Sequence, residues 1–325
     1  MVGVKQQKEK PLLSIKPSPS EKESLSKIAA GTAEGLWFFQ DSQQQLELER
    51  HSVNAIAKSD DGIWVVDDFS SVWNRDLNGQ WNQVGSVKDL RLNCILPLEG
   101  AILAGTSEAH LVLIADGNVK LLDSFEEVEG RSEWYTPWGG PPAVRSLAAS
   151  VQNELYVNVH VGGILRSQDG GQSWVPTIDL HSDVHQVLTV SDRPNLVLAA
   201  TAQGLAISKD RGHSWQFERN GLHATYSRAV AVCGNDVLIS VSDGPHGDRA
   251  ALYRLGLDDL GTFEKCQQGL PKWFSDNINT NNLVASANRA AFGTSEGDIF
   301  VSDDAGKTWK QIGTKLPPIQ CLYLI

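Results

Sequence analysis

Three features of the 325-residue sequence predict an all-β fold, a single seven-bladed β-propeller. A short turn motif recurs, an apolar strand returns seven times at intervals of 38 to 54 residues, and the two ends of the chain together hold one complete unit. A repeat of roughly 40 to 45 residues is the length of one four-stranded propeller blade. We therefore expect residues 28–325 to form the propeller, preceded by a disordered polar tail over residues 1–27.

The turn motif has the pattern Ser-x-Asp-x-Gly-x-Ser/Thr-Trp at residues 167–174, 208–215 and 302–309. Its Asp can accept hydrogen bonds from backbone amides just ahead of it, and its Gly supplies a positive φ. The Trp then begins the next strand and offers a large ring for burial. Degenerate copies of the motif lie at residues 76–81 and 258–263. The expected structural residues of the three full copies are Asp169, Gly171, Trp174, Asp210, Gly212, Trp215, Asp304, Gly306 and Trp309.

This motif resembles the Asp-box, or BNR, repeat. The chain is similar in this respect to the β-propellers of sialidases, sortilin-type receptors, xyloglucan-cleaving enzymes and photosystem assembly factors. The resemblance covers nearly the whole chain beyond residue 27. It implies the propeller fold and does not select one function.

Each expected blade contains an apolar strand that follows one polar residue. These seven polar residues are Asn54, Asn93, Arg145, His185, Arg228, Asn282 and Gln320. The last strand ends with the chain at Ile325, so its blade lacks three strands there. Residues 28–38 match residues 290–300, which predicts that the start of the chain supplies the missing strands. A blade completed from both ends leaves no open sheet edge.

The order of strands within a blade predicts where a binding site lies. With strands a to d counted outward, the Asp-boxes are c–d turns, and the b–c turns and d–a links lie on the opposite face. Seven of the eight histidines fall in or beside these b–c turns and d–a links, as do long insertions at residues 133–142, 243–249 and 272–281. Long insertions on one face of a repeat array often form its binding surface. We therefore expect the site on the face opposite the Asp-boxes.

The first hypothesis is a binding module for a small polar, glycan-like or peptide ligand in the central funnel. Arg145 and Arg228 would hold an anionic group through paired hydrogen bonds. The expected ligand-binding residues are Trp138, Arg145, Asn158, His160, His185, His223, Tyr226, Arg228, Trp273, Asn277 and Asn282. The alternative for each of them is a hydrogen-bonded polar group that lines a wet channel.

Two enzyme classes stay open as alternatives. A glycoside hydrolase requires two positioned carboxyl groups, and the candidates on this face are Glu133, Asp183, Asp243 and Asp276. The three Asp residues are the expected catalytic ones. A metal-dependent lyase, similar to those that act on uronates, would bind a divalent metal through imidazole groups. Its expected ligands come from three adjacent blades and are His160, His185 and His223.

Composition excludes other classes. The chain has 28 Lys+Arg against 39 Asp+Glu, a net charge of −11, which argues against a nucleic-acid partner. No apolar stretch approaches the roughly 20 residues that span a bilayer. Four cysteines lie far apart in apolar runs without a Cys-x-x-Cys pair, which indicates buried, reduced thiols and a cytoplasmic protein.

Overall fold

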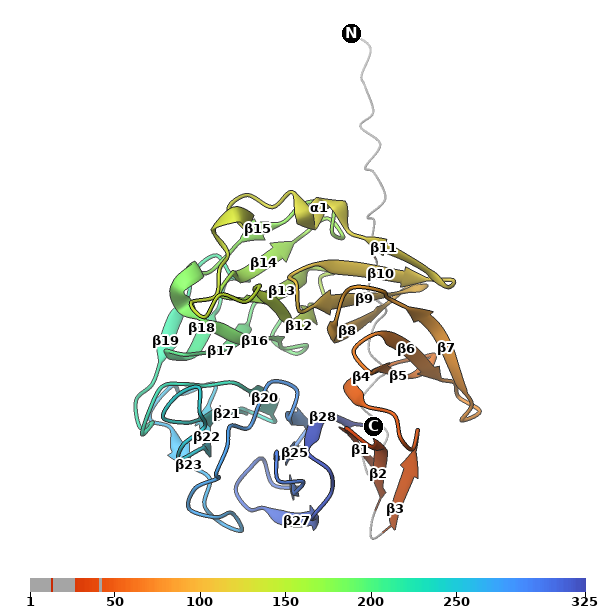
Figure 1. Cartoon of the computed structure of the whole chain (residues 1–325). Coiled ribbons are helices and arrows are strands. Elements are labelled where there is room, and N and C mark those ends of the chain that lie inside the picture. The colour runs from red at the N-terminus through yellow and green to blue at the C-terminus, as the bar shows by residue number, and fades with distance from the viewer. Residues whose placement is uncertain (1–12, 14–26, 41–42) are drawn as a thin grey trace.

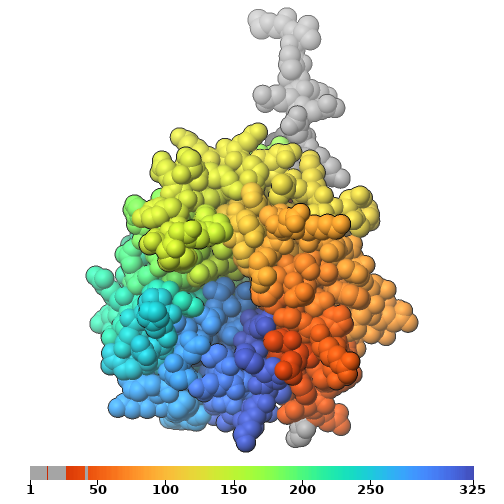
Figure 2. All heavy atoms as spheres, viewed as in Figure 1, coloured from red at the N-terminus to blue at the C-terminus, as the bar shows by residue number. Residues whose placement is uncertain are grey.

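The protein is a ring of seven four-stranded antiparallel sheets, as a computed structural model shows (Figure 1). The structure describes residues 13, 27–40 and 43–325. Because the sheets follow one another around a centre, they are the blades of a β-propeller, and the predicted fold class is confirmed. In the space-filling view, neighbouring blades abut one another around the ring (Figure 2).

Three blades follow the closing blade in chain order, and each is named by its first and last strand, from the innermost strand outward. Blade β4–β7 comprises β4 (Val53–Ser59), β5 (Gly62–Asp67), β6 (Ser71–Arg75) and β7 (Trp81–Ser86). Blade β8–β11 comprises β8 (Leu92–Leu98), β9 (Ala101–Thr106), β10 (Leu111–Ala115) and β11 (Asn118–Leu121). Blade β12–β15 comprises β12 (Ala143–Ala149), β13 (Leu155–His160), β14 (Gly163–Ser167) and β15 (Val175–Pro176).

Three more blades continue the ring, and three short helices interrupt the links. Blade β16–β19 comprises β16 (Val184–Thr189), β17 (Val197–Thr201), β18 (Gly204–Ser208) and β19 (Gln216–Glu218). Blade β20–β23 comprises β20 (Val230–Cys233), β21 (Asp236–Val241), β22 (Ala251–Gly256) and β23 (Glu264–Lys265). Blade β24–β27 comprises β24 (Leu283–Ser286), β25 (Arg289–Gly293), β26 (Ile299–Ser302) and β27 (Lys310–Gly313). The helices are α1 (Asp123–Glu126), η1 (Arg131–Glu133) and η2 (Leu180–Ser182).

The closing blade joins both ends of the chain, as expected. Its innermost strand is β28 (Ile319–Leu324), which pairs antiparallel with β1 (Lys27–Thr32). The outer strands are β2 (Gly35–Gln40) and β3 (Gln43–Glu47). The seven innermost strands contact one another in ring order, from β28 through β4 and round to β24. Each sheet edge at the centre of the ring therefore meets the next blade.

The predicted polar residue at the start of the innermost strand coincides with a β-bulge in five of the blades. The pairing register skips one residue there, and the skipped residues are Asn54, Asn93, Arg145, His185 and Gln320. A bulge turns the side chain of its extra residue away from the regular alternation of the strand. In these five blades the fold therefore re-aims one polar side chain near the centre of the ring.

The three full Asp-boxes are c–d turns, as predicted. Their Asp carboxylates accept hydrogen bonds from backbone amides of the same turn. In the last one, the Asp304 carboxylate accepts hydrogen bonds from the Thr308 amide at 2.8 Å and from the Thr308 hydroxyl at 2.6 Å. The equivalent bonds form in the other two boxes. The Gly residues at the fifth position have φ values of 84°, 87° and 79°, a region that Gly enters without strain. Trp174 and Trp309 are buried, and Trp215 packs partly buried between blades.

These turns predict how stability depends on acid pH. The hydrogen bond from Ser214 lowers the pKa of Asp210 from 3.8 to about 2, and at Asp304 the bonds from Thr308 outweigh burial and also bring the pKa to about 2. A carboxyl group whose pKa is lower in the folded state stabilises it fully above about pH 4, and this stabilisation is lost as the pH falls towards 2. We expect melting temperature to fall with pH across this window. Asp210→Asn should flatten the slope, and an unchanged slope would contradict the assignment.

A cluster of four aromatic rings lies between blades β20–β23 and β24–β27. Phe292 is fully buried and stacks on Phe300, with ring centroids 5.0 Å apart. Trp309 and Phe274 meet Phe292 edge to face at 5.0 and 5.4 Å. The Asp-box Trp of the last full box thus anchors its turn in the core.

The predicted tail over residues 1–27 lies outside the described residues, except for Leu13 and Lys27. Lys27 is the first residue of β1. Leu13 is buried in the apolar cluster of blades β8–β11 and β12–β15, and its amide donates to the Gly170 carbonyl at 2.9 Å. All four cysteines are buried and unpaired, as predicted. Within the described chain, no helix has the length and apolar character needed to cross a membrane.

Candidate functional site

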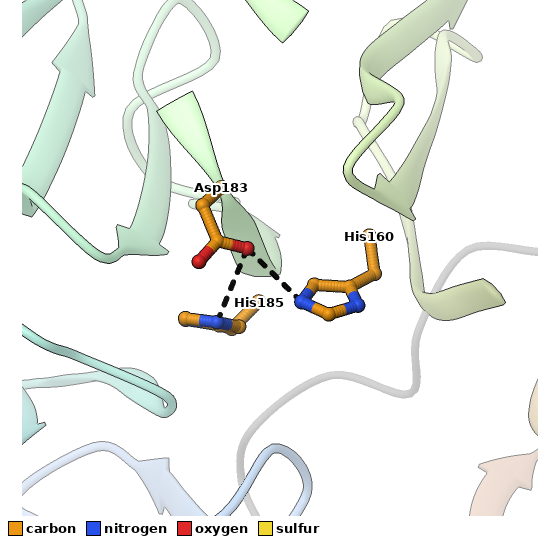
Figure 3. A group of neighbouring side chains, drawn as sticks. All are labelled: His160, Asp183 and His185. Atoms are coloured by element: carbon orange, nitrogen blue, oxygen red, sulfur yellow. Dashed lines mark ion pairs between the residues drawn. The ribbon is translucent and has the colours of Figure 1, made fainter. Parts of the chain in front are cut away.

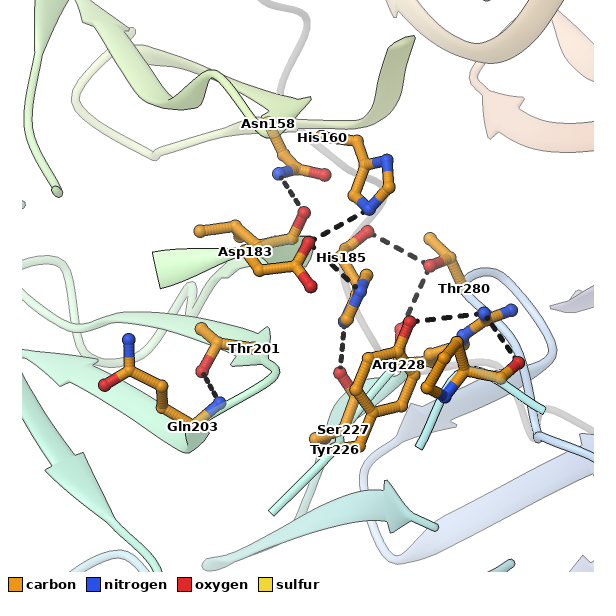
Figure 4. A network of polar contacts seen from close by, with 12 residues as sticks. Asn158, His160, Asp183, His185, Thr201, Gln203, Tyr226, Ser227, Arg228 and Thr280 are labelled. Atoms are coloured by element: carbon orange, nitrogen blue, oxygen red, sulfur yellow. Dashed lines mark hydrogen bonds and ion pairs between the residues drawn. The ribbon is translucent and has the colours of Figure 1, made fainter. Parts of the chain in front are cut away.

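A row of rings and charges crosses three blades at the centre of the propeller. Trp138 lies beside His160 with ring centroids 5.2 Å apart, His160 beside His185 at 5.5 Å, and His185 beside Tyr226 at 4.7 Å. The guanidinium carbon of Arg228 lies 5.3 Å from the Tyr226 ring centroid. Figure 4 shows the part of this row from His160 to Arg228. The structure therefore brings five of the predicted ligand-binding residues together on one face.

The local structure explains why these side chains meet. His160 ends β13 at a b–c turn, and it pairs with Ala143 at the start of β12. His185 is the bulged residue near the start of β16, and Arg228 lies just before β20. Starts of innermost strands and b–c turns share one face, so residues 25 to 43 positions apart along the chain become neighbours.

Asp183 stands between the two histidines. It follows η2 in the left-handed backbone region, with φ 47°, a conformation that Asp adopts more readily than most residues. Its Oδ1 lies 3.0 Å from Nε2 of His160 and 3.5 Å from Nε2 of His185 (Figure 3). Asp183 was expected as a catalytic carboxylate, and the structure places it as the shared neighbour of two imidazoles.

His185 also has a structural contact that repeats around the ring. Its Nδ1 donates to the Ser227 carbonyl of the next blade at 2.7 Å. Asn93 and Asn282 make the same kind of contact, with the carbonyls of Val144 at 3.1 Å and Ile319 at 2.9 Å. In each case the accepting carbonyl belongs to the residue just before the polar residue at the start of the next blade's innermost strand. This bond ties neighbouring blades together, so Asn282, predicted to bind ligand, has a structural role.

Arg145 occupies the same position and departs from this pattern. In its blade, Asn158 makes the contact with the next blade, donating to the Val184 carbonyl at 2.9 Å. The partly buried Arg145 guanidinium has no hydrogen bond to any described residue. Burial and the nearby charge of Arg228 lower the pKa of Arg145 to about 10. A partly buried cation without a hydrogen-bond partner among the described residues contributes little to stability, which points to a role with a ligand.

Arg228 is held in place by three contacts. It donates to Asn279 Oδ1 at 2.7 Å, to the Tyr226 hydroxyl at 3.3 Å and to the Pro245 carbonyl at 3.3 Å. Thr280 joins the same region, because its hydroxyl lies 3.0 Å from the carbonyls of both His185 and Arg228. The 272–281 insertion therefore fixes the orientation of Arg228.

Charges and burial set the ionisation of the site. Burial lowers the pKa of His185 to about 3 and also lowers that of His160, so both rings are neutral at neutral pH. Burial raises the pKa of Asp183, but its contacts with His160, His185 and Arg145 outweigh this and lower it. Two arginines and one aspartate then leave one net positive charge at the site, in a chain whose total is −11.

Buried polar atoms without a hydrogen-bond partner among the described residues gather here. They are Oδ1 of Asn158, Oδ1 of Asp183, Nε2 of His185, Oγ of Ser227 and Nε of Arg228. The Asp183 oxygen is included because its short contact with His160 does not have hydrogen-bond geometry. Buried polar groups in native proteins are nearly always satisfied, so a bound molecule, ion or ordered water is expected to complete these hydrogen bonds.

A second cluster contains three of the other predicted residues, His223, Trp273 and Asp243. His223 contacts the Tyr253 hydroxyl through Nδ1 at 2.8 Å, and its ring lies 4.6 Å from that of Trp273. Its Nε2 is 3.6 Å from Asp243, a carboxylate that also pairs with Arg249 at 2.7 Å. His223 therefore lies outside the His160, Asp183 and His185 group that the described residues form.

Two further predicted residues shape the loop after β21. The Asn277 side chain accepts from the Ser242 hydroxyl at 2.6 Å and donates to the Gly244 and Pro245 carbonyls. The Asp276 carboxylate accepts from the Asn277 amide at 2.7 Å. These contacts give Asn277 a structural role in holding the 243–249 loop.

Sequence reasoning missed the backbone and hydroxyl groups that orient the site. The Ser227 carbonyl fixes the His185 ring, and Thr280 bridges two blades. A carbonyl has no sequence signal, because every residue carries one. Thr280 was within a recognised insertion, but its polar neighbours gave no reason to select it.

Comparison with known proteins supports the architecture. The segment 300–311 matches the BNR/Asp-box repeat family. Comparison with curated protein sequences gives no significant match. The chain is a seven-bladed β-propeller that carries Asp-box repeats.

Solved structures of similar fold include enzymes and a peptide-binding protein. An ancestral GH74 enzyme is 15% identical with a TM-score of 0.59, and the match covers 80% of this chain and 38% of the enzyme. YCF48 bound to D1 peptide is 14% identical with a TM-score of 0.59, over 87% of this chain and 88% of that one. The GH74 enzyme of Niastella koreensis is 12% identical with a TM-score of 0.56, over 88% and 47%. At these identities the likeness establishes the fold alone, and this chain spans less than half of either GH74 enzyme.

Proposed function

We propose that the protein is a binding module that recognises the carboxylate of a small peptide or acidic sugar. The site is the row from Trp138 to Arg228 on the face opposite the Asp-boxes. Arg145 and Arg228 contact the carboxylate, and the exposed Trp138 ring packs against the rest of the ligand. YCF48, whose fold is similar over most of both chains, was solved with a bound peptide, which supports a binding role for this architecture.

The unpartnered guanidinium of Arg145 is the observation that carries this proposal. At the equivalent position of three other blades, Asn93, His185 and Asn282 each donate a hydrogen bond to the next blade. The Arg145 guanidinium makes no hydrogen bond to a described residue. Arg presents paired donors whose spacing matches a carboxylate. An incoming carboxylate would satisfy Arg145 and balance the positive charge it shares with Arg228.

The hydrolase alternative finds less support in the electrostatics. Glycoside hydrolysis requires one carboxyl group that stays protonated near neutral pH, and such a group has a raised pKa. The pKa of Asp183 is lowered, and a hydrogen bond from Arg249 lowers that of Asp243. Both are therefore ionised, which suits binding and orientation better than acid catalysis. The assignment of Asp183, Asp243 and Asp276 as catalytic stays a prediction.

Isothermal titration calorimetry with matched ligands tests the proposal. Peptides with a free C-terminal carboxylate are compared with the same peptides amidated, and uronic acids with the corresponding neutral sugars. We expect binding to require the carboxylate. Arg145→Gln should weaken it about 10- to 100-fold, because a hydrogen bond to a charged group contributes about 1.5–3 kcal/mol.

The matched control is Arg254→Gln, which removes an arginine paired with Glu264 on the outer strands of blade β20–β23. Its affinity should equal that of the unsubstituted protein. Arg145→Gln should keep its melting temperature, since Arg145 has no described partner to lose. Equal binding of carboxylate and neutral ligands, or no binding by either, would contradict the proposal.

A further inference from the structure

We propose that His160, Asp183 and His185 form a binding site for one divalent transition-metal ion, of which Zn²⁺ is the simplest probe. The proposal does not depend on the proposed carboxylate recognition, because it uses different atoms. The three residues come from two neighbouring blades and from the link between them. Their candidate ligand atoms all lie within 4.8 Å of one another.

The distances suit coordination of a single ion. Zn²⁺ binds imidazole nitrogen and carboxylate oxygen at about 2.0–2.2 Å, so neighbouring ligand atoms lie about 3.0–3.5 Å apart. Oδ1 of Asp183 lies 3.0 Å from Nε2 of His160 and 3.5 Å from Nε2 of His185. Because all candidate ligand atoms lie within 4.8 Å of one another, one ion can contact the two nitrogens and the oxygen (Figure 3).

The orientation of His185 is the second, independent observation. This side chain is fully buried, and its Nδ1 donates to the Ser227 carbonyl, which can only accept. When the ring carries one proton, that proton is on Nδ1, and Nε2 presents a lone pair to Oδ1 of Asp183. Both atoms lack a hydrogen-bond partner among the described residues. A metal-binding histidine typically donates its other nitrogen to a carbonyl in this way.

A cation explains the facing lone pairs better than a proton does. A proton on Nε2 of His160 would point at Asp183 without hydrogen-bond geometry, and it would leave His185 facing a carboxylate oxygen with nothing between them. An ion at this position satisfies all three ligand atoms at once. Asn158 Oδ1, buried and also without a described partner, lies in the same network (Figure 4).

The donor set selects the class of metal. Two imidazoles and one carboxylate suit first-row transition metals, whereas Mg²⁺ and Ca²⁺ prefer oxygen ligands alone. Three protein ligands leave coordination positions open, as in sites where a metal contacts a ligand or water. The Arg145 charge near Asp183 opposes a cation, so we expect moderate affinity rather than the tight binding of structural zinc sites.

Metal titration of the full-length, untagged protein after chelator treatment tests this site. We expect one equivalent of Zn²⁺ by calorimetry and one of Co²⁺ by visible absorption, with no heat from Mg²⁺ or Ca²⁺. Asp183→Asn keeps the shape of the side chain and tolerates the left-handed backbone. It should reduce Zn²⁺ affinity more than about 100-fold, since even changes next to a metal ligand cost about 10–100-fold.

His223→Gln is the matched control, because His223 is a histidine of the same face outside the group, and its Zn²⁺ affinity should be unchanged. If Asp183→Asn fails to fold, His160→Gln replaces it with the same expected loss. Absence of stoichiometric Zn²⁺ binding, or equal affinity in Asp183→Asn, would overturn the proposal.

The two proposals fail separately. Titrating a carboxylate peptide into chelator-treated protein measures recognition by the arginines without added metal. Binding of the peptide together with no metal binding removes the metal site alone. Metal binding with no preference for the carboxylate removes the proposed function alone.

Discussion

Phe292→Ala is expected to lower the free energy of unfolding by about 3–5 kcal/mol, the usual cost of removing a buried aromatic ring. Phe292 is fully buried and contacts the rings of Phe300, Trp309 and Phe274. These four rings fill one interface between blades, so neighbouring side chains cannot close the space without moving a sheet. Urea denaturation followed by tryptophan fluorescence measures the change.

Leu77→Ala is the matched control for this loss. Leu77 lies in the degenerate Asp-box turn of blade β4–β7 and is 81% exposed. Truncating its side chain should therefore change the free energy of unfolding by no more than about 0.5 kcal/mol. A similar loss in both variants would mean that burial between these two blades does not determine stability.

Deletion of residues 319–325 is expected to abolish the folded ring. The deletion removes β28, which pairs with β1 and contacts the innermost strands of both neighbouring blades. Ile319, Leu322 and Leu324 belong to the apolar cluster that joins the closing blade to blade β24–β27. Without them, β1 presents an unpaired edge and apolar surface to water, which favours aggregation.

The measurement is soluble yield together with the melting transition. Deletion of Ile325 alone is the control, because it keeps β28 whole and removes one backbone bond to Lys27 and the packing of one partly buried side chain. A synthetic peptide covering residues 317–325 should restore the transition in the shortened protein. A soluble, cooperatively melting protein without the peptide would show that closure by β28 is dispensable.

The fold could be predicted from sequence because each blade repeats its own signals. The Asp-boxes depend on contacts within eight residues, such as those of Asp304 with Ser302 and Thr308, so their pattern survives in the linear sequence. The match between residues 28–38 and 290–300 likewise predicted that the start of the chain forms strands of the closing blade. In the structure, β1 and β2 pair antiparallel, as β25 and β26 do.

The site could be predicted only in outline. Loop topology placed Trp138, His160, His185 and Arg228 on one face, and they do meet there. The register bulges that aim individual side chains could not be predicted, since they depend on pairing between strands. For this reason the sequence could not distinguish Asn282, which joins two blades, from Arg145, which has no described hydrogen-bond partner.

Because the pairing register could not be predicted, the sequence also could not show which histidines lie close together. His185 lies at the start of one expected innermost strand, and His223 lies in the link before the next. The sequence therefore gave no reason to prefer one of them as a metal ligand. The left-handed turn at Asp183 brings its carboxylate to His160 and His185, while the Tyr253 hydroxyl and Trp273 hold His223 elsewhere. The backbone conformation at Asp183 and the contacts of His223 together decide which groups cluster, and neither can be predicted from the sequence pattern.

The buried cysteines give the molecule a set of native reporters. Cys94, Cys233 and Cys321 lie on the innermost strands of three separate blades, and burial raises the thiol pKa of Cys94 and Cys233 to about 12. Alkylating reagents attack the thiolate, so they find no target while the ring is intact. Mapping which cysteine is alkylated first during gentle denaturation would therefore show where the circle of blades begins to separate, without any engineered label.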